Sequence, residues 1–327
     1  MDILKKREFQ TSWLGSVAAY LFLGGLGAGA YVVAATASLL GDDWAPVTNA
    51  GLTISFPLVI TGLIFLLAHL GSPKRAHRSA ARLGSSWISR GVVIISIFMA
   101  LSVIHFLGQV TPLGFVADAA EGSALKVVLP IAGIIFGLLV TLYTGALLSA
   151  SKGFPLWRTG VLPVLFMVSA LFTGLLGTMI AVAIVGASKI TVMQFQDLAL
   201  AGAGLALVEL LVIFFFLHTA YRTTDSREGA ESMATSPIFI FGDLLMGLLV
   251  PMIVLLMMYF KMGAASTTAL AATGAVAGVL GLIGGFLLRF SVLSAGKQIS
   301  LEASGFTFRS PATAPTLKTP IGRLPPQ

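Results

Sequence analysis

The stretch YLFLGGLGAGAYVVAA, residues 20–35, decides the fold class, and it lies within residues 13–40, which contain no charged side chain. An apolar block of about 18 or more residues is typical of a helix that crosses the hydrocarbon core of a bilayer. In lipid, only helices and closed barrels satisfy every backbone hydrogen-bonding group. Barrel strands alternate apolar and polar residues, and this block does not alternate. The stretch therefore predicts a transmembrane helix.

Similar apolar blocks recur along all 327 residues. The chain is 57% hydrophobic and only 10% charged, whereas about a quarter of the residues in soluble domains are charged. The first block is too long for the core of a cleavable signal peptide. We expect an all-α integral membrane protein with about eight transmembrane helices arranged as two four-helix bundles. The expected spans are 13–40, 46–71, 86–108, 125–150, 155–185, 192–222, 236–260 and 264–292.

The basic residues predict how the chain is oriented. An even number of spans puts both termini on one side of the membrane, here named side A, and the opposite side is named side B. Of the 20 Lys and Arg residues, 17 fall on side A. Cytoplasmic loops carry such an excess of positive charge. We therefore expect a multi-pass protein of the cell inner (plasma) membrane with both termini in the cytoplasm.

The sequence also contains a sign of internal duplication. His69 and His218 end the second and sixth spans in similar contexts, LIFLLAHLG and VIFFFLHTA. Parallel repeats of four helices would produce this pattern, and chance similarity between apolar helices is the alternative. The expected division is an N-terminal segment at 1–12, halves at 13–150 and 151–296, and a Pro-rich, extended or disordered tail at 297–327.

Basic residues concentrate between the second and third spans, in HLGSPKRAHRSAARLGSSWISRG, residues 69–91. This can be an ordinary cytoplasmic loop, or a surface that docks a partner protein or an anionic head group. Arg90 lies about one turn inside the third span, where an unpaired charge is costly, and His69 closes the second span at similar depth. The candidates for partner docking are Arg75, Arg78 and Arg82.

Two carboxylates are expected inside spans. Glu209 falls near the middle of the sixth span and Asp243 about two turns into the seventh. Buried carboxylates in lipid are candidates for proton carriers or ion ligands, although a protonated carboxyl bonded between helices is the alternative. Asp197 and His105 lie toward side B. These four residues suggest a proton path from side B through Glu209 toward side A.

Two further polar residues lie near the side A ends of their spans. Tyr143 can be an interfacial anchor, or its hydroxyl can donate a hydrogen bond to a quinone carbonyl. Arg289 is placed similarly at the end of the eighth span, and extension of its side chain to the interface is the ordinary interpretation. Haem would need two facing axial ligands, and only His69 and His218 qualify. Because intramembrane histidines are scarce, we expect no haem.

Several segments in shared order resemble the membrane subunit of polysulfide reductase and the related NrfD-type quinone-interacting subunits. They cover nearly the whole membrane region. The segments are YLFLGGLGAGAY, HLGSPKRAHR with SSWISRG, YTGALLSA, PLWRTGVLPVLFMVSALFTG and LLRFSVLSAG.

The resemblance implies two packed four-helix halves, no haem, and menaquinone or ubiquinone bound near one membrane face. It also implies a ferredoxin-like iron–sulfur partner subunit and a molybdopterin or similar catalytic subunit. With no cysteine, this protein cannot itself hold a cysteine-ligated iron–sulfur cluster. Tyr143 matches the family tyrosine of the quinone site. We predict that the quinone site comprises Tyr143, His69, Arg90 and Trp87.

One departure from the family pattern concerns the residues before the YLF motif. Relatives often carry a His there, whereas this sequence reads TSWLGSVAAYLF. Either His69 or Trp13 takes the part of that His, or the site is altered. Many relatives serve catalytic subunits on the outer face, but the charge distribution favours a cytoplasmic partner here.

The leading hypothesis is a quinone-binding membrane anchor of a respiratory oxidoreductase complex, without catalytic residues or a metal site of its own. A secondary transporter that uses Glu209 and Asp243 as coupling carboxylates is one alternative. A haem-b cytochrome subunit is the other.

Overall fold

The computed structural model describes residues 3–9, 15–69, 87–109, 124–151, 153–185, 189–261, 266–303 and 306–308. Within these ranges, eight helical segments are long and apolar enough to cross a membrane. This confirms the predicted all-α class and the predicted number of spans. The basic candidates Arg75, Arg78 and Arg82 and most of the Pro-rich tail lie outside the described residues.

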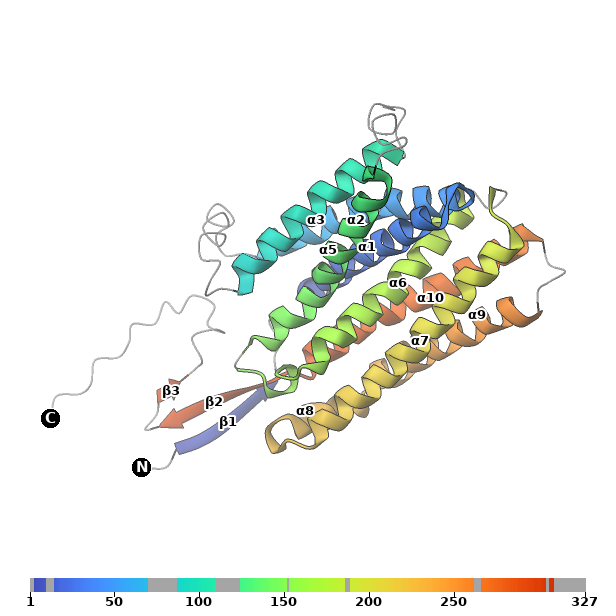
Figure 1. Ribbon diagram of the computed structural model, residues 1–327. Helices are drawn as coiled ribbons and strands as arrows, with labels where there is room; N and C mark the ends of the chain where they lie inside the picture. The colour runs from blue at the N-terminus through green and yellow to red at the C-terminus, as the bar shows by residue number, and fades with distance from the viewer. Residues whose placement is uncertain are drawn as a thin grey trace.

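The spans form one bundle of roughly parallel and antiparallel helices (Figure 1). The first four are α1 (Gly15–Leu40), α2 (Ala45–His69), α3 (Trp87–Gln109) and α5 (Leu125–Ser149). The next four are α6 (Val161–Val185), α7 (Val192–Tyr221), the continuous η5 (Ile238–Leu249) and α9 (Val250–Lys261), and α10 (Thr267–Ser294). Short 3₁₀ turns precede α2 and α6, namely η1 (Asp42–Trp44) and η3 (Pro155–Trp157).

Helices α1 and α6 form the centre of the bundle. Most of their residues are buried, whereas α3 is largely exposed on the outside. The backbones of α1 and α6 come very close where Gly29 faces Gly174, because neither residue carries a side chain there. Small residues commonly allow such contacts between membrane helices. Because α6 packs against both α1 and α10, the division of the chain at residue 150 remains a prediction.

Helix η5 departs from ordinary α-helical geometry. Its residues Ile238–Leu249 adopt a π-helical pattern that continues directly into α9. Long π-helical stretches are rare, and short ones are frequent at functional sites. Asp243 lies in this segment and is buried. The pattern of hydrophobic residues alone predicts a span here but not its unusual winding.

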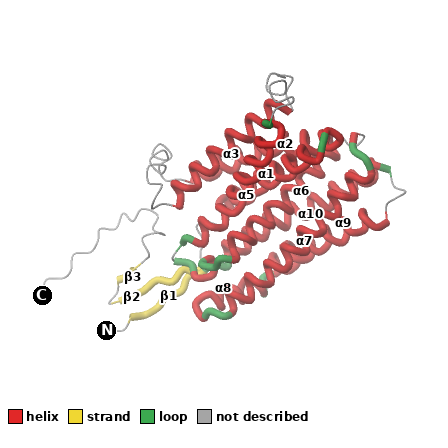
Figure 2. The backbone as a smooth tube through the Cα atoms, in the orientation of Figure 1, coloured by secondary structure: helices red, strands yellow, loops and turns green. Residues whose placement is uncertain are grey.

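A small antiparallel sheet lies at the side A end of the bundle, beyond the helices (Figure 2). Strand β1 (Ile3–Phe9) pairs with β2 (Lys297–Ala303), which also pairs with β3 (Phe306–Phe308). The sheet therefore joins the first and last described segments. It was not predicted, since residues 297–327 were expected to be extended or disordered.

A short helix, α8 (Thr224–Ala234), connects α7 to η5 on the same side. It was not predicted either. Its Glu228 carboxylate accepts a hydrogen bond from the Lys297 ammonium at 3.1 Å, which ties α8 to the start of β2. The segments on side A therefore support one another outside the apolar bundle.

Candidate functional site

A narrow cavity lies between four helices of the first half, with Tyr143 in its wall. Its volume is about 40 Å³, enough for water molecules but not for a quinone ring. The walls are apolar except for two tyrosines and a threonine. The lining residues are Tyr20, Leu21 and Gly24 of α1; Val59, Gly62, Leu63 and Leu66 of α2; Ile95 of α3; and Val140, Tyr143, Thr144 and Leu147 of α5.

Helix α3 fixes the position of the Tyr143 ring. A methyl group on Gly91 would overlap the ring and hydroxyl of Tyr143, so only glycine allows the ring to pack there. Tyr20 lies near enough to Tyr143 for the two side chains to interact electrostatically. The sequence motifs predicted Tyr143 for the quinone site and did not single out Tyr20, which opens the quoted YLF motif. Gly24, one turn later on the same face of α1, lines the same cavity.

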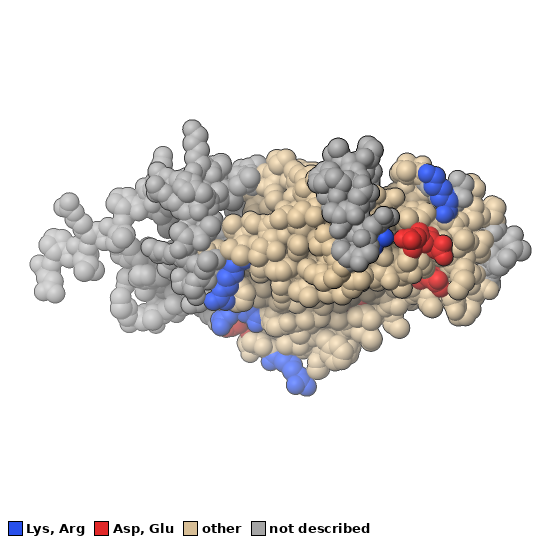
Figure 3. Space-filling model, turned by 45° about the horizontal axis from the view of Figure 1, so that its top comes forward, with Lys and Arg blue, Asp and Glu red and all other residues tan. Residues whose placement is uncertain are grey.

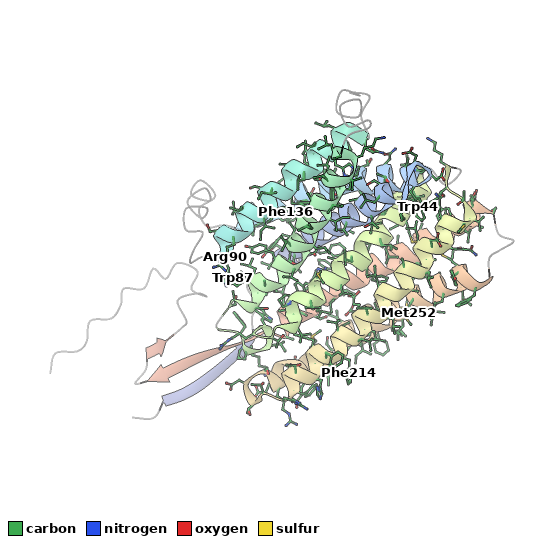
Figure 4. All side chains as sticks on the ribbon, viewed as in Figure 1. Trp44, Trp87, Arg90, Phe136, Phe214 and Met252 are labelled. Carbon is green, nitrogen blue, oxygen red and sulfur yellow. The ribbon has the colours of Figure 1, made fainter. Side chains whose placement is uncertain are left out.

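The other residues predicted for the quinone site are not seen among the described side chains in the wall of the Tyr143 cavity. Trp87 and Arg90 begin α3 at its side A end (Figure 4), and the Arg90 guanidinium carbon is 5.1 Å from the centre of the Trp87 ring. Neither residue lines the Tyr143 cavity. Trp87 instead borders a second cavity of about 360 Å³ with Arg158 and Ser149. His69 ends α2, and its side chain lies outside the described residues.

Arg289 is fully buried, so its side chain does not extend to the interface as the ordinary interpretation would have it. Its Nη1 donates to the Ser169 hydroxyl at 3.0 Å and to the Gly285 carbonyl at 2.6 Å. Its guanidinium carbon lies 5.5 Å from the centre of the Phe22 ring and 5.4 Å from that of Phe166. These cation–π contacts and hydrogen bonds hold the charge inside the bundle. The sequence places Arg289 near the end of a helix, but it does not tell how that helix is oriented about its axis. The structure shows that the Arg289 side chain faces the inside of the bundle.

Glu209 and Asp243 lie in the same buried region as Arg289. Both carboxyl groups interact electrostatically with the guanidinium, and the Ser169 hydroxyl also interacts with Glu209. Among the described side chains, no direct ion pair joins them, and each carboxyl has a buried oxygen without a protein partner. Buried polar atoms of this kind are usually satisfied by internal water. We call these four residues, Ser169, Glu209, Asp243 and Arg289, the buried charge cluster.

The four predicted proton-path residues therefore separate in space. Glu209 and Asp243 come together in the buried charge cluster. His105 of α3 instead shares a 3.0 Å hydrogen bond with the buried Tyr31 hydroxyl of α1. Asp197 lies in the second turn of α7 and is exposed. No described contact joins His105 or Asp197 to the cluster, so the continuous path remains a prediction.

The described residues contain no group of three His, Asp or Glu side chains placed to hold a metal ion. Of the histidines with described side chains, His105 bonds to Tyr31 and His218 stacks on Phe214 at a ring distance of 6.0 Å.

Comparison with known proteins identifies the family. The family described as polysulphide reductase, NrfD matches residues 5–300. The chain belongs to this NrfD family. The match covers all eight spans and part of strands β1 and β2, and it confirms the resemblance drawn from the sequence motifs.

Individual relatives agree with this assignment. The protein is 27% identical to a protein NrfD homolog of Haemophilus influenzae over 87% of its own length and 94% of that relative. It is 31% identical to one of the polysulfide reductase polypeptides of Wolinella succinogenes over 51% of its own length and 57% of the relative. It is 34% identical to a sulfite dehydrogenase subunit of Allochromatium vinosum over 33% of its own length and 34% of the relative.

Proposed function

We propose that this protein is the membrane anchor subunit of a respiratory oxidoreductase complex, and that it binds quinone or quinol at the Tyr143 cavity. Two similar proteins are named as parts of polysulfide reductase and sulfite dehydrogenase, which supports a role inside a larger redox complex. The partners we propose are an iron–sulfur subunit and a molybdopterin or similar catalytic subunit, docked on side A.

The single observation that carries the proposal is the pairing of two tyrosines in one apolar cavity. Tyr20 and Tyr143 both line a space that is otherwise walled almost entirely by aliphatic residues. Ligand sites of this kind combine apolar walls with a few polar groups that orient the ligand. A phenol can donate a hydrogen bond to a carbonyl or accept one from a hydroxyl. A tyrosine hydroxyl in this cavity can therefore form a hydrogen bond with either the quinone or the quinol.

Binding needs the cavity to widen, because about 40 Å³ is smaller than a quinone ring. The walls that can yield are the flexible side chains of Leu63, Leu66 and Leu147. The Tyr143 ring packs closely against Gly91. The tyrosine hydroxyls then orient the bound ring, and the aliphatic walls keep bulk water away.

A bound quinone would supply exchange of electrons together with protons. Helix α1 separates the cavity from the buried charge cluster: Tyr20 and Gly24 line the cavity, while Phe22 and Gly25 contact Arg289. One guanidinium can neutralise one of the two carboxylates in the cluster, and the other carboxyl can take up or release a proton. We propose that Glu209 and Asp243 exchange protons with the cavity across this helix.

Tyrosine substitutions test the site in the intact complex. We expect Tyr143→Phe and Tyr20→Phe each to raise the KM for quinone or quinol by about 2- to 10-fold, since each removes one hydrogen bond. The matched control is Tyr259→Phe, which makes the same chemical change in α9, far from the cavity. Steady-state kinetics with a soluble quinone analogue measures the effect. Unchanged KM and turnover in both cavity variants would contradict the proposal that quinone binds at the Tyr143 cavity.

A separate experiment tests the anchor role. The native protein, purified in mild detergent, should retain an iron–sulfur subunit that shows the absorbance and paramagnetic signals of its clusters. The transporter alternative would be supported by two results together. The protein would be isolated alone, and vesicles containing it would take up a substrate only when Glu209 and Asp243 are present.

A further inference from the structure

A third cavity, separate from the tyrosine site and the buried charge cluster, lies between α1 and α7. Its volume is about 440 Å³, within the range of pockets that bind small organic molecules. Helix α6 forms its floor, and the walls are almost entirely aliphatic, represented by Val33, Leu175 and Leu205. No residue of the buried charge cluster and neither tyrosine of the proposed quinone site lines it.

This cavity is an elongated groove that opens toward lipid. On α7 it extends from Asp197 to Leu205, a rise of about 12 Å along the helix axis. Ala201, midway along this wall, is exposed, and Leu40 at the end of α1 is 60% exposed. A long, open and apolar groove fits an extended hydrocarbon chain better than a compact ligand.

The mouth of the groove lies at the side B interface. Trp44, which lines it, is at the end of the bundle opposite Trp87 (Figure 4). Tryptophan is enriched at the level of lipid head groups. The Gln194 side chain donates a hydrogen bond to the Asp43 carbonyl at 2.8 Å, which holds the turn that carries Trp44 against the start of α7. The groove therefore begins at head-group depth and continues into the hydrocarbon region.

The charge at the mouth selects the head group. Among the described residues that line the groove, Asp197 is the only charged one, and the adjoining turn carries the exposed Asp42 and Asp43. In Figure 3, acidic side chains gather at this end of the face in view, with a basic side chain beside them. Carboxylates attract an ammonium group and repel an anionic head group. The same carboxylates would attract a neutral quinol less strongly than an ammonium group.

We propose that the groove binds one phospholipid with an ammonium head group, such as phosphatidylethanolamine. One acyl chain lies along Val33, Leu175 and Leu205, and the ammonium group pairs with Asp197 at the mouth. This gives Asp197 a role apart from the predicted proton path. A lipid held in this way fills the space between α1 and α7, and so supports the packing of both halves around α6.

Native mass spectrometry of the full-length protein tests this proposal. The protein is purified in mild detergent and supplied with equal amounts of dioleoyl phosphatidylethanolamine and dioleoyl phosphatidylglycerol. We expect one phosphatidylethanolamine per protein molecule. Asp197→Asn, which preserves the shape of the groove, should weaken this retention about threefold, as expected for loss of a partly exposed ion pair. Equal retention of the two lipids by the unsubstituted protein would overturn the choice of head group.

A matched pair of substitutions on α7 tests the location. Ala201→Trp fills the groove and should abolish retention of the lipid. Leu200→Trp adds a ring at the neighbouring exposed position, which does not line the groove, and should retain the lipid. Retention in both variants places the lipid elsewhere and overturns the site. Recovery of a quinone rather than a phospholipid, lost on Ala201→Trp, also overturns the proposal. Asp197→Asn still tests it if Ala201→Trp does not fold.

Discussion

Arg289 is a full positive charge inside an apolar bundle, and its neighbours must compensate for its lost hydration. Two buried carboxyls, one hydroxyl and one backbone carbonyl surround it, together with the faces of two phenylalanine rings. An isolated charge in such an environment is strongly destabilising. The three charged residues of the cluster are therefore energetically interdependent.

This interdependence predicts the effect of Arg289→Gln. Removal of one partner from a buried ionic group typically costs about 3–5 kcal/mol, so thermal unfolding of the purified protein should occur at a clearly lower temperature. The control is Arg227→Gln, which removes an exposed ion pair with Glu231 and should change stability by less than about 1 kcal/mol.

A second substitution separates charge from packing. If uncompensated carboxylates cause the loss, adding Glu209→Gln to Arg289→Gln should restore part of the stability. A double variant that is less stable than either single variant would show that shape, not charge balance, governs the region.

The sequence identified Glu209 and Asp243 as candidates because a carboxylate in an apolar span is conspicuous without any structure. It did not identify the inward orientation of Arg289, since position along a helix says nothing about which neighbour the side chain faces. The prediction that Trp87 and Arg90 belong to the quinone site remains untested. Both residues lie at the same membrane face as Tyr143, but they line no part of its cavity.

At the scale of helices, close crossings at glycines pack the spans together, both between the first and second half of the protein and within the second half. Gly29 and Gly174 allow α1 to touch α6, and Gly247 and Gly284 do the same for η5 and α10. With lipid outside and apolar side chains inside, helix association depends largely on packing at such contacts. The Tyr143 cavity depends on the first crossing because α1 supplies Tyr20.

Gly174→Ala should therefore destabilise the protein, since the added methyl group would overlap the backbone of Gly29 and Ala30. Overpacking of this kind costs about 1–3 kcal/mol, measurable as a lower unfolding temperature in detergent. Gly204→Ala is the matched control, because an added methyl group there meets no atom within 4 Å. Equal unfolding temperatures for the two variants would contradict the importance of the crossing.

The number and approximate bounds of the spans were predictable because hydrophobic length alone determines them. The π-helical winding of η5, the short helix α8 and the terminal sheet were not. Helix α8 has a mostly polar sequence, TDSREGAESMA, which resembles an ordinary loop. The strands pair segments from opposite ends of the chain, and no local pattern reveals such a long-range contact.

For the whole molecule, the distribution of basic residues predicts which end faces the cytoplasm. The turn at Asp42 and the start of α10 lie on side B, whereas the junction of α7 and α8 lies on side A. Because the sequence contains no cysteine, single cysteines can report the sidedness of each position without background labelling.

We expect Asp42→Cys and Ser266→Cys to react with a membrane-impermeant thiol reagent on intact spheroplasts. Thr223→Cys should react only after permeabilisation. All three positions are exposed, so accessibility to the reagent is comparable once the membrane is opened. The reverse labelling pattern would place side A outside and move the proposed partner to that face.

The terminal sheet also has a consequence for biogenesis. Strand β1 is synthesised first, but its pairing partner β2 follows α10, the last span. The sheet therefore closes only after the ribosome has completed every transmembrane helix and the translocon has released the polypeptide. A truncated or incompletely inserted protein leaves β1 unpaired, so the closed sheet marks a finished protein at the face where we propose that the partner docks.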